Sequence, residues 1–119
     1  MQFWGVGIFD NDVAQRVREQ FTQAMDEGLS VFAAADRILN APRNPLEDSG
    51  RPQVFLALAA CQLEHGLIQP KIKKNALTVI NLGEDEENWL SSSSETQVAR
   101  KKVLAELREK LLATDSGIG

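Results

Sequence analysis

The sequence has few of the residues that build catalytic and metal sites: its 119 residues include one cysteine, one histidine and no tyrosine. The single Cys61 cannot form a disulfide within the chain, which is typical of proteins in the reducing cytoplasm. A zinc site made of Cys and His needs more ligands than the chain has. Phosphate-binding loops, Ser-His-Asp sets and cofactor fingerprints are also missing. We therefore predict no enzyme activity, no cofactor and no bound metal.

Long apolar runs and an excess of basic residues are absent as well. No apolar run approaches the roughly 20 residues of a membrane span, and the N-terminus lacks the basic and apolar regions of a signal peptide. The net charge of -4 argues against nucleic-acid binding. Lys71, Lys73 and Lys74 lack the interleaved aromatic and arginine side chains of a nucleic-acid surface. We expect a cytoplasmic protein that binds neither membranes nor nucleic acid.

The residues that are present predict an all-α fold. Hydrophobic residues make up 43% and charged residues 25%, as in an ordinary domain with its own core. Apolar residues recur at helical spacing in five segments, which run from a cap at Asp10 to Gly28, from a cap at Ser30 towards Pro42, from Pro52 to Gly66, from Pro70 to Leu82 and from Glu95 to Ala113. We expect one domain over residues 1–119, a compact bundle of about five helices, with an anchoring N-terminal segment at 1–9 and a flexible tail at 114–119.

Two of these helices carry a prediction about the core. The third is apolar on nearly all sides between Val54 and Cys61, so we place it at the centre of the bundle. The last has an apolar stripe at four-residue spacing, formed by Ala99, Val103, Leu107 and Leu111 and flanked by Leu104 and Leu112. We expect this stripe to face the other helices.

The stretch MQFWGVGIFDNDVAQ is the most distinctive part of the sequence. Asp10 directly precedes the first helix and is a good N-cap, and Asp12 then lies in the first turn, where the helix dipole favours a negative charge. Phe9 can pack back onto the helix as a hydrophobic staple. With Trp4, it would tie the N-terminal segment to the bundle.

The two spaced glycines of this stretch have a structural explanation too. Gly5 and Gly7 can adopt positive φ angles or allow another stretch of backbone to approach closely. An anion at the helix N-terminus is a functional alternative, but the two aspartates oppose it. A cation held by Asp10, Asn11 and Asp12 is another, but the ligand spacing and distal glutamate of a calcium loop are missing. We therefore favour a structural role.

The same stretch resembles the start of a bacterial family known as domain of unknown function four-two-five-nine. The residues that carry the resemblance are Trp4, Gly5, Gly7, Phe9, Asp10, Asn11 and Asp12. The acidic stretch that leads from Glu84 to Trp89 before the last helix is similar to that family as well. The resemblance implies a compact, mainly helical bacterial domain. It brings no established activity and no catalytic residues.

Cys61 and His65 lie four residues apart, so they share one face of a helix. Metal binding would need further ligands, and a Cys-His nucleophilic pair would need a reactive thiol. Cys61 lies within an apolar run, where a thiol is usually an inert, small hydrophobic group. We therefore predict a structural role for both residues.

The acidic run before the last helix is the candidate partner-binding site. Glu84, Asp85, Glu86 and Glu87 are followed by Trp89, and an aromatic residue beside a group of charges is typical of a docking surface. The alternative is a solvated linker. The first interpretation predicts a protein partner with a basic surface.

Three functions remain open from the sequence alone. The first is a non-catalytic protein-interaction module, such as an immunity-type inhibitor. The second is a small metal-dependent enzyme that uses Asp10 and Asp12. The third is a structural homo-oligomer that assembles through the last helix. The small size, the acidic patch and the missing catalytic set favour the first, while the identity of the partner and the oligomeric state stay open.

Overall fold

The computed structural model describes residues 3–41 and 50–114, and these form an all-α structure, as predicted. The described residues contain no strand beyond one isolated bridge between Phe3 and Asn11. The elements are the five helices α1 (Asp12–Asp26), α2 (Val31–Leu39), α3 (Arg51–Glu64), α4 (Pro70–Leu82) and α5 (Ser94–Ala113), and the short 3-10 helix η2 (Glu86–Trp89). The predicted bundle of about five helices is confirmed.

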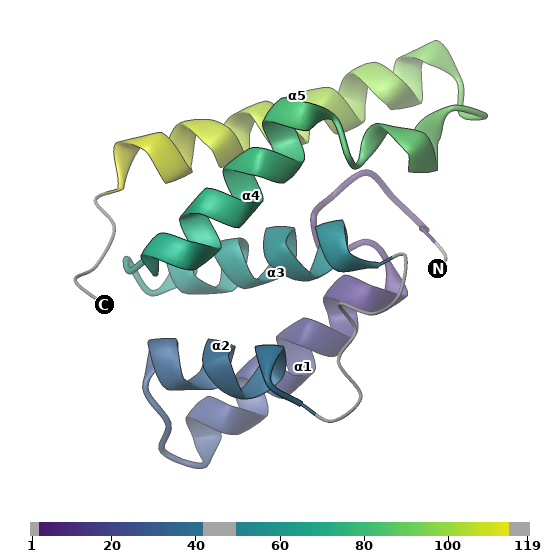
Figure 1. The fold of residues 1–119 in the computed structure, drawn as a ribbon. Coiled ribbons are helices and arrows are strands. Elements are labelled where there is room, and N and C mark those ends of the chain that lie inside the picture. The colour runs from purple at the N-terminus through teal and green to yellow at the C-terminus, as the bar shows by residue number, and fades with distance from the viewer. Residues whose placement is uncertain (1–2, 42–49, 115–119) are drawn as a thin grey trace.

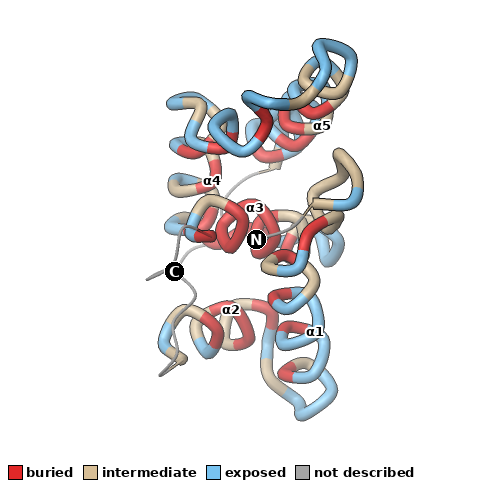
Figure 2. Tube along the Cα trace, turned by 90° about the vertical axis from the view of Figure 1, so that its right-hand side faces the viewer, coloured by how far each residue is buried: buried red, intermediate tan, exposed pale blue. Residues whose placement is uncertain are grey.

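Helix α3 lies at the centre of the molecule, also as predicted. Helices α1 and α2 pack on one side of it, and α4 and α5 lie on the other (Figure 1). Every residue from Val54 to Ala59 is buried, and α3 is the most continuously buried part of the trace in Figure 2. A helix that is apolar on nearly all sides needs neighbours on more than one side, and the four other α-helices supply them.

Local signals set most of the helix ends. Ser30 caps α2, where its hydroxyl accepts a hydrogen bond of 3.1 Å from the amide of Ala33. Helix α4 begins at Pro70 and is followed by Gly83, whose φ of 68° is in the left-handed region that favours glycine. The predicted bounds of α4 are therefore confirmed.

The cap of α1 corrects a prediction. The N-cap is Asn11 and not Asp10: the side-chain oxygen of Asn11 accepts from the amide of Ala14 at 2.8 Å, and its amide group donates to the carbonyl of Ile8 at 3.3 Å. Asp10 accepts instead from the amide of Gly7 at 2.9 Å. The carboxylate of Asp10 binds the Gly7 amide in the preceding turn and does not cap the helix. Helix α1 therefore has its cap one residue later than predicted.

The packed face of α5 is also different from the predicted one. The buried residues of this helix are Arg100, Leu104, Leu107 and Leu111, whereas Ala99 and Val103 are only partly buried. The helix is thus rotated so that a charged residue, Arg100, faces the interior. The contacts of Arg100 described below are the physical reason.

Two predicted segments lie mostly outside the described residues. These are the stretch between the second and third predicted helices, from Pro42 onwards, and the tail at 114–119, of which only Thr114 is described. The carbonyl of Thr114 accepts a hydrogen bond of 2.9 Å from Lys73.

The identity of the N-cap can be tested by mutation. Asn11→Ala should lower the free energy of unfolding by about 1–2 kcal/mol, because the amide of Ala14 loses its acceptor in a buried place. Asn11→Ser should cost less, since the serine hydroxyl can still accept from the Ala14 amide and buries no charge. Urea denaturation measures both values. An Asn11→Ala protein as stable as the wild type would show that Asn11 does not cap α1.

Candidate functional site

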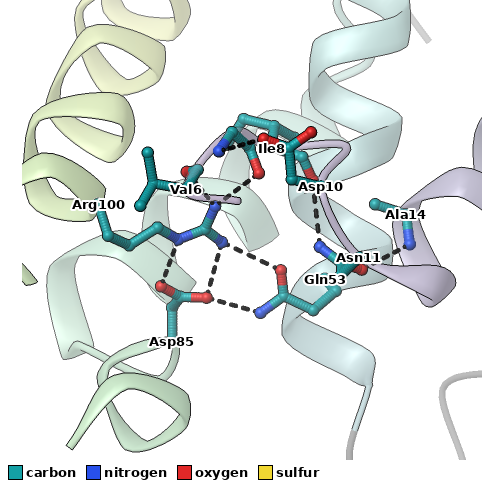
Figure 3. Close-up of polar contacts among 9 residues, drawn as sticks. Val6, Ile8, Asp10, Asn11, Ala14, Gln53, Asp85 and Arg100 are labelled. Atoms are coloured by element: carbon teal, nitrogen blue, oxygen red, sulfur yellow. Dashed lines mark hydrogen bonds and ion pairs between the residues drawn. The ribbon is translucent and has the colours of Figure 1, made fainter. Parts of the chain in front are cut away.

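The side chain of Arg100 is the centre of a buried polar network between α5 and the segment before η2. Its Nε and Nη2 atoms each donate to Asp85, to Oδ2 and Oδ1, and both distances are 2.8 Å (Figure 3). Both side chains are almost fully buried. This two-bond geometry is the strong form of an arginine–carboxylate pair.

Helix α3 and the N-terminal segment complete the network. Gln53 of α3 accepts from Arg100 at 3.1 Å and donates to Asp85 at 2.6 Å. The Nη1 atom of Arg100 donates to the carbonyls of Val6 and Gly7, at 3.0 and 3.1 Å (Figure 3). One guanidinium group therefore joins three segments that are far apart in the sequence, and each of its three nitrogen atoms makes at least one hydrogen bond.

Two aromatic rings lie close to the same guanidinium group. The centre of the guanidinium is 5.3 Å from the ring of Trp89 and 5.8 Å from the ring of Phe3, and the two ring centroids are 4.6 Å apart. These distances suit cation–π and aromatic contacts. The indole Nε1 of Trp89 is buried without a hydrogen-bond partner among the described residues. The contact between Phe3 and Trp89 holds the N-terminal segment against η2.

The two tryptophans exchange the roles that the sequence predicts for them. Trp4, expected to anchor the N-terminal segment, is 60% exposed. Trp89, expected on a docking surface, is only 7% exposed. The reason is that Phe3, not Trp4, packs on Trp89. The N-terminal segment is anchored by Phe3, by the backbone carbonyls that accept from Arg100, and by Phe9, which packs against the core as predicted.

The glycines of the N-terminal motif make room for the carboxylate of Asp10. Neither has a positive φ, so the first of the two explanations is wrong. The second, close approach of another stretch of backbone, is wrong as well, because the atoms that lie close to both glycines belong to a side chain. A Cβ atom at Gly7 would lie 2.8 Å from Oδ2 of Asp10, and one at Gly5 would lie closer still. The group that approaches is the side chain that binds the Gly7 amide.

The acidic run is divided between the interior and the surface. Asp85 is buried against Arg100, so the prediction that it belongs to an exposed patch is wrong, as it is for Trp89. Glu84, Glu86 and Glu87 are exposed. The next residue after the buried tryptophan, Leu90, is 74% exposed.

These exposed residues belong to the segment that contains η2. The contact between Phe3 and Trp89 joins this segment to the N-terminal segment, in which the exposed Trp4 follows Phe3, and the N-terminal trace passes close to the segment before α5 in Figure 1. We call this surface the acidic end face and define it by Trp4, Glu84, Glu86, Glu87 and Leu90. The buried network of Arg100 lies beneath it.

The other candidate groups do not assemble into a catalytic or metal site within the described residues. Cys61 is buried, whereas His65 is exposed at the end of α3. Burial, with a smaller contribution from the nearby Glu64 carboxylate, raises the pKa of the Cys61 thiol to about 12. No three Cys, His, Asp or Glu side chains in residues 3–41 and 50–114 come together as metal ligands.

The three lysines at the start of α4 do not act as one basic patch. Lys71 forms an ion pair with Asp36 of α2, and this contact is the main reason why the pKa of Asp36 is lowered. Lys73 donates to the carbonyl of Thr114. Lys74 is exposed.

Comparisons add no relative to this description: no family of known proteins, no curated protein and no solved structure matches the chain. The resemblance to the bacterial family of unknown function therefore stays a prediction. Among the described helices, none has both the length and the apolar character needed to cross a bilayer.

The buried ion pair leads to a stability prediction. Arg100→Met should lower the free energy of unfolding by about 3–5 kcal/mol, because the carboxylate of Asp85 would stay buried without its cation. Adding Asp85→Leu should recover part of this loss. Lys102→Met, on the exposed side of the same helix, should change stability by less than about 0.5 kcal/mol. If urea denaturation gave the same free energy of unfolding for Arg100→Met and Lys102→Met, this role for Arg100 would be contradicted.

The raised pKa of Cys61 leads to a second prediction. With a pKa of about 12 in place of 9.0, the folded protein holds about a thousandfold less thiolate at pH 8 than an ordinary thiol would. A disulfide reagent such as Ellman's reagent should therefore react far more slowly with the native protein than with the protein in urea. Equal rates in the two states would show that the thiol is accessible and reactive.

Proposed function

We propose that this protein is a non-catalytic interaction module that binds a basic protein partner through the acidic end face. The observation that carries the proposal is the composition of that surface. Three exposed glutamates and the exposed Leu90 belong to one short segment, and the neighbouring N-terminal segment, joined to it through Phe3 and Trp89, adds the exposed Trp4. Tryptophan is among the residues that contribute most to protein–protein binding, and apolar groups surrounded by charge are typical of docking sites.

The network beneath the surface supports the proposal. Asp85 and Trp89 are buried members of the same segment that displays the glutamates, and both contact Arg100. They hold the segment in place before any partner arrives. A preorganised surface loses less conformational entropy on binding, and a group of like charges attracts an oppositely charged partner from a distance.

An immunity-type inhibitor is the form of this function that we favour. Such a protein blocks a toxic enzyme by covering it, and it needs no catalytic group of its own. The small chain, the net charge of -4 and the acidic end face suit a basic enzyme as the partner. The buried, unoxidised Cys61 suits our proposed location, the cytoplasm.

The two alternatives receive less support from the contacts. For a metal-dependent enzyme based on Asp10 and Asp12, the described residues bring no third Cys, His, Asp or Glu ligand to these aspartates. A homo-oligomer formed through α5 is favoured by one observation, the exposure of Val98 and Leu112 on that helix. Both are isolated apolar side chains among charged ones, and such residues are common on monomeric proteins.

Charge reversal tests the proposal. A partner is first captured with the tagged wild-type protein and identified by mass spectrometry, and its association is then measured by surface plasmon resonance. The triple variant Glu84→Lys, Glu86→Lys, Glu87→Lys should lower the association rate constant by about tenfold or more at low salt. The dependence of that rate on salt should also become weaker, because the attraction has been removed.

A matched variant controls for net charge alone. Glu19→Lys, Asp26→Lys and Glu109→Lys produce the same change in charge at exposed positions outside the acidic end face. This control should bind nearly as fast as the wild type. The proposal fails if the two triple variants associate with the partner at the same rate.

A further inference from the structure

A small hollow opens between η2 and the first half of α5, at the edge of the acidic end face. Its volume is about 60 Å³. Trp89, Leu90 and Leu104 supply its apolar walls, and it is also lined by Asp85, Glu86, Gln97, Arg100 and Lys101. Asp85 and Arg100 are paired with each other, so Glu86 and Lys101 are the exposed charges at its rim. Glu86 belongs to the proposed docking surface, whose other two exposed glutamates do not line the hollow.

The size and walls of the hollow limit what can enter. Sites for small-molecule ligands usually enclose about 300–1,000 Å³, so a hollow of about 60 Å³ suits a single side chain. Its walls are mainly apolar, which favours an aliphatic group over a charged one. Trp89 also carries the buried indole N–H that has no acceptor among the described residues. Such a donor gains a hydrogen bond if an incoming segment brings a carbonyl group to it.

We propose that this hollow accepts one aliphatic side chain of a basic partner segment, and that a lysine or arginine beside that side chain pairs with Glu86. This inference rests on the proposed function and specifies it further. The partner then needs an apolar residue next to basic ones, not merely a positive surface. Charge brings the two proteins together, and the filled hollow slows their separation.

The chain offers two matched pairs of residues for the test. Leu82 and Leu90 are exposed to almost the same extent, 73% and 74%, but only Leu90 lines the hollow. Glu86 and Glu87 are adjacent exposed glutamates, and only Glu86 lines it. All four side chains are on the surface, so replacing them should leave the fold intact.

The probes are two synthetic peptides of alternating lysine and alanine, one with a leucine at its centre and one with an alanine there. Binding is followed by NMR titration through the indole N–H signal of Trp89, which is assigned by comparison with a Trp4→Phe protein. The leucine peptide should bind the wild-type protein about tenfold more tightly than the alanine peptide, because only leucine fills the hollow.

Single substitutions at the matched residues then show which side chains cause the tighter binding of the leucine peptide. Leu90→Ala and Glu86→Gln should each reduce the advantage of the leucine peptide, whereas Leu82→Ala and Glu87→Gln should leave it nearly unchanged. Equal affinity of the two peptides for the wild type would overturn the inference, and so would the absence of any shift of the Trp89 signal. The proposed function would still stand in either case if charge reversal slowed association of the captured partner. If charge reversal had no effect, both would fall.

Discussion

The rest of the structure depends on one buried ion pair, between Arg100 and Asp85. A charge removed from water is tolerated only when its hydrogen bonds are made within the protein. Arg100 makes them to Asp85, to Gln53 of α3 and to the carbonyls of Val6 and Gly7. Helix α3, helix α5, the segment before η2 and the N-terminal segment must therefore be in place together. Loss of any one of them would leave a charged or polar group buried without its partner.

The same pair explains two features that otherwise look unrelated. Helix α5 packs with Arg100 inwards and Val103 only partly buried, because the guanidinium group has to reach Asp85. Asp85 is drawn inside while the acidic residues on either side of it stay in water. One residue of the acidic run, Asp85, thus forms an internal contact. That contact fixes the position of the segment that displays the three exposed glutamates.

The parts of the fold that depend on nearby residues could be predicted from the sequence. Ser30, Pro70 and Gly83 act on the helix ends beside them, and the apolar run of α3 places it at the centre. The burial of Trp89 and Asp85 depends on Phe3 and Arg100, which are distant in the sequence, and no local pattern shows it. One signal was available: Arg100 continues the spacing of Leu104, Leu107 and Leu111, and an arginine in an apolar stripe indicates a buried acidic partner.

The hydrogen bonds from Arg100 to Val6 and Gly7 join residues that are 94 and 93 positions apart. A ribosome makes the two carbonyls early and the guanidinium group late, so the N-terminal segment leaves the exit tunnel long before its partner exists. Helices α1 and α2 can pack on each other during that interval, because their contacts with one another need no later part of the chain. Completion of the acidic end face is thus delayed until Arg100 has left the tunnel.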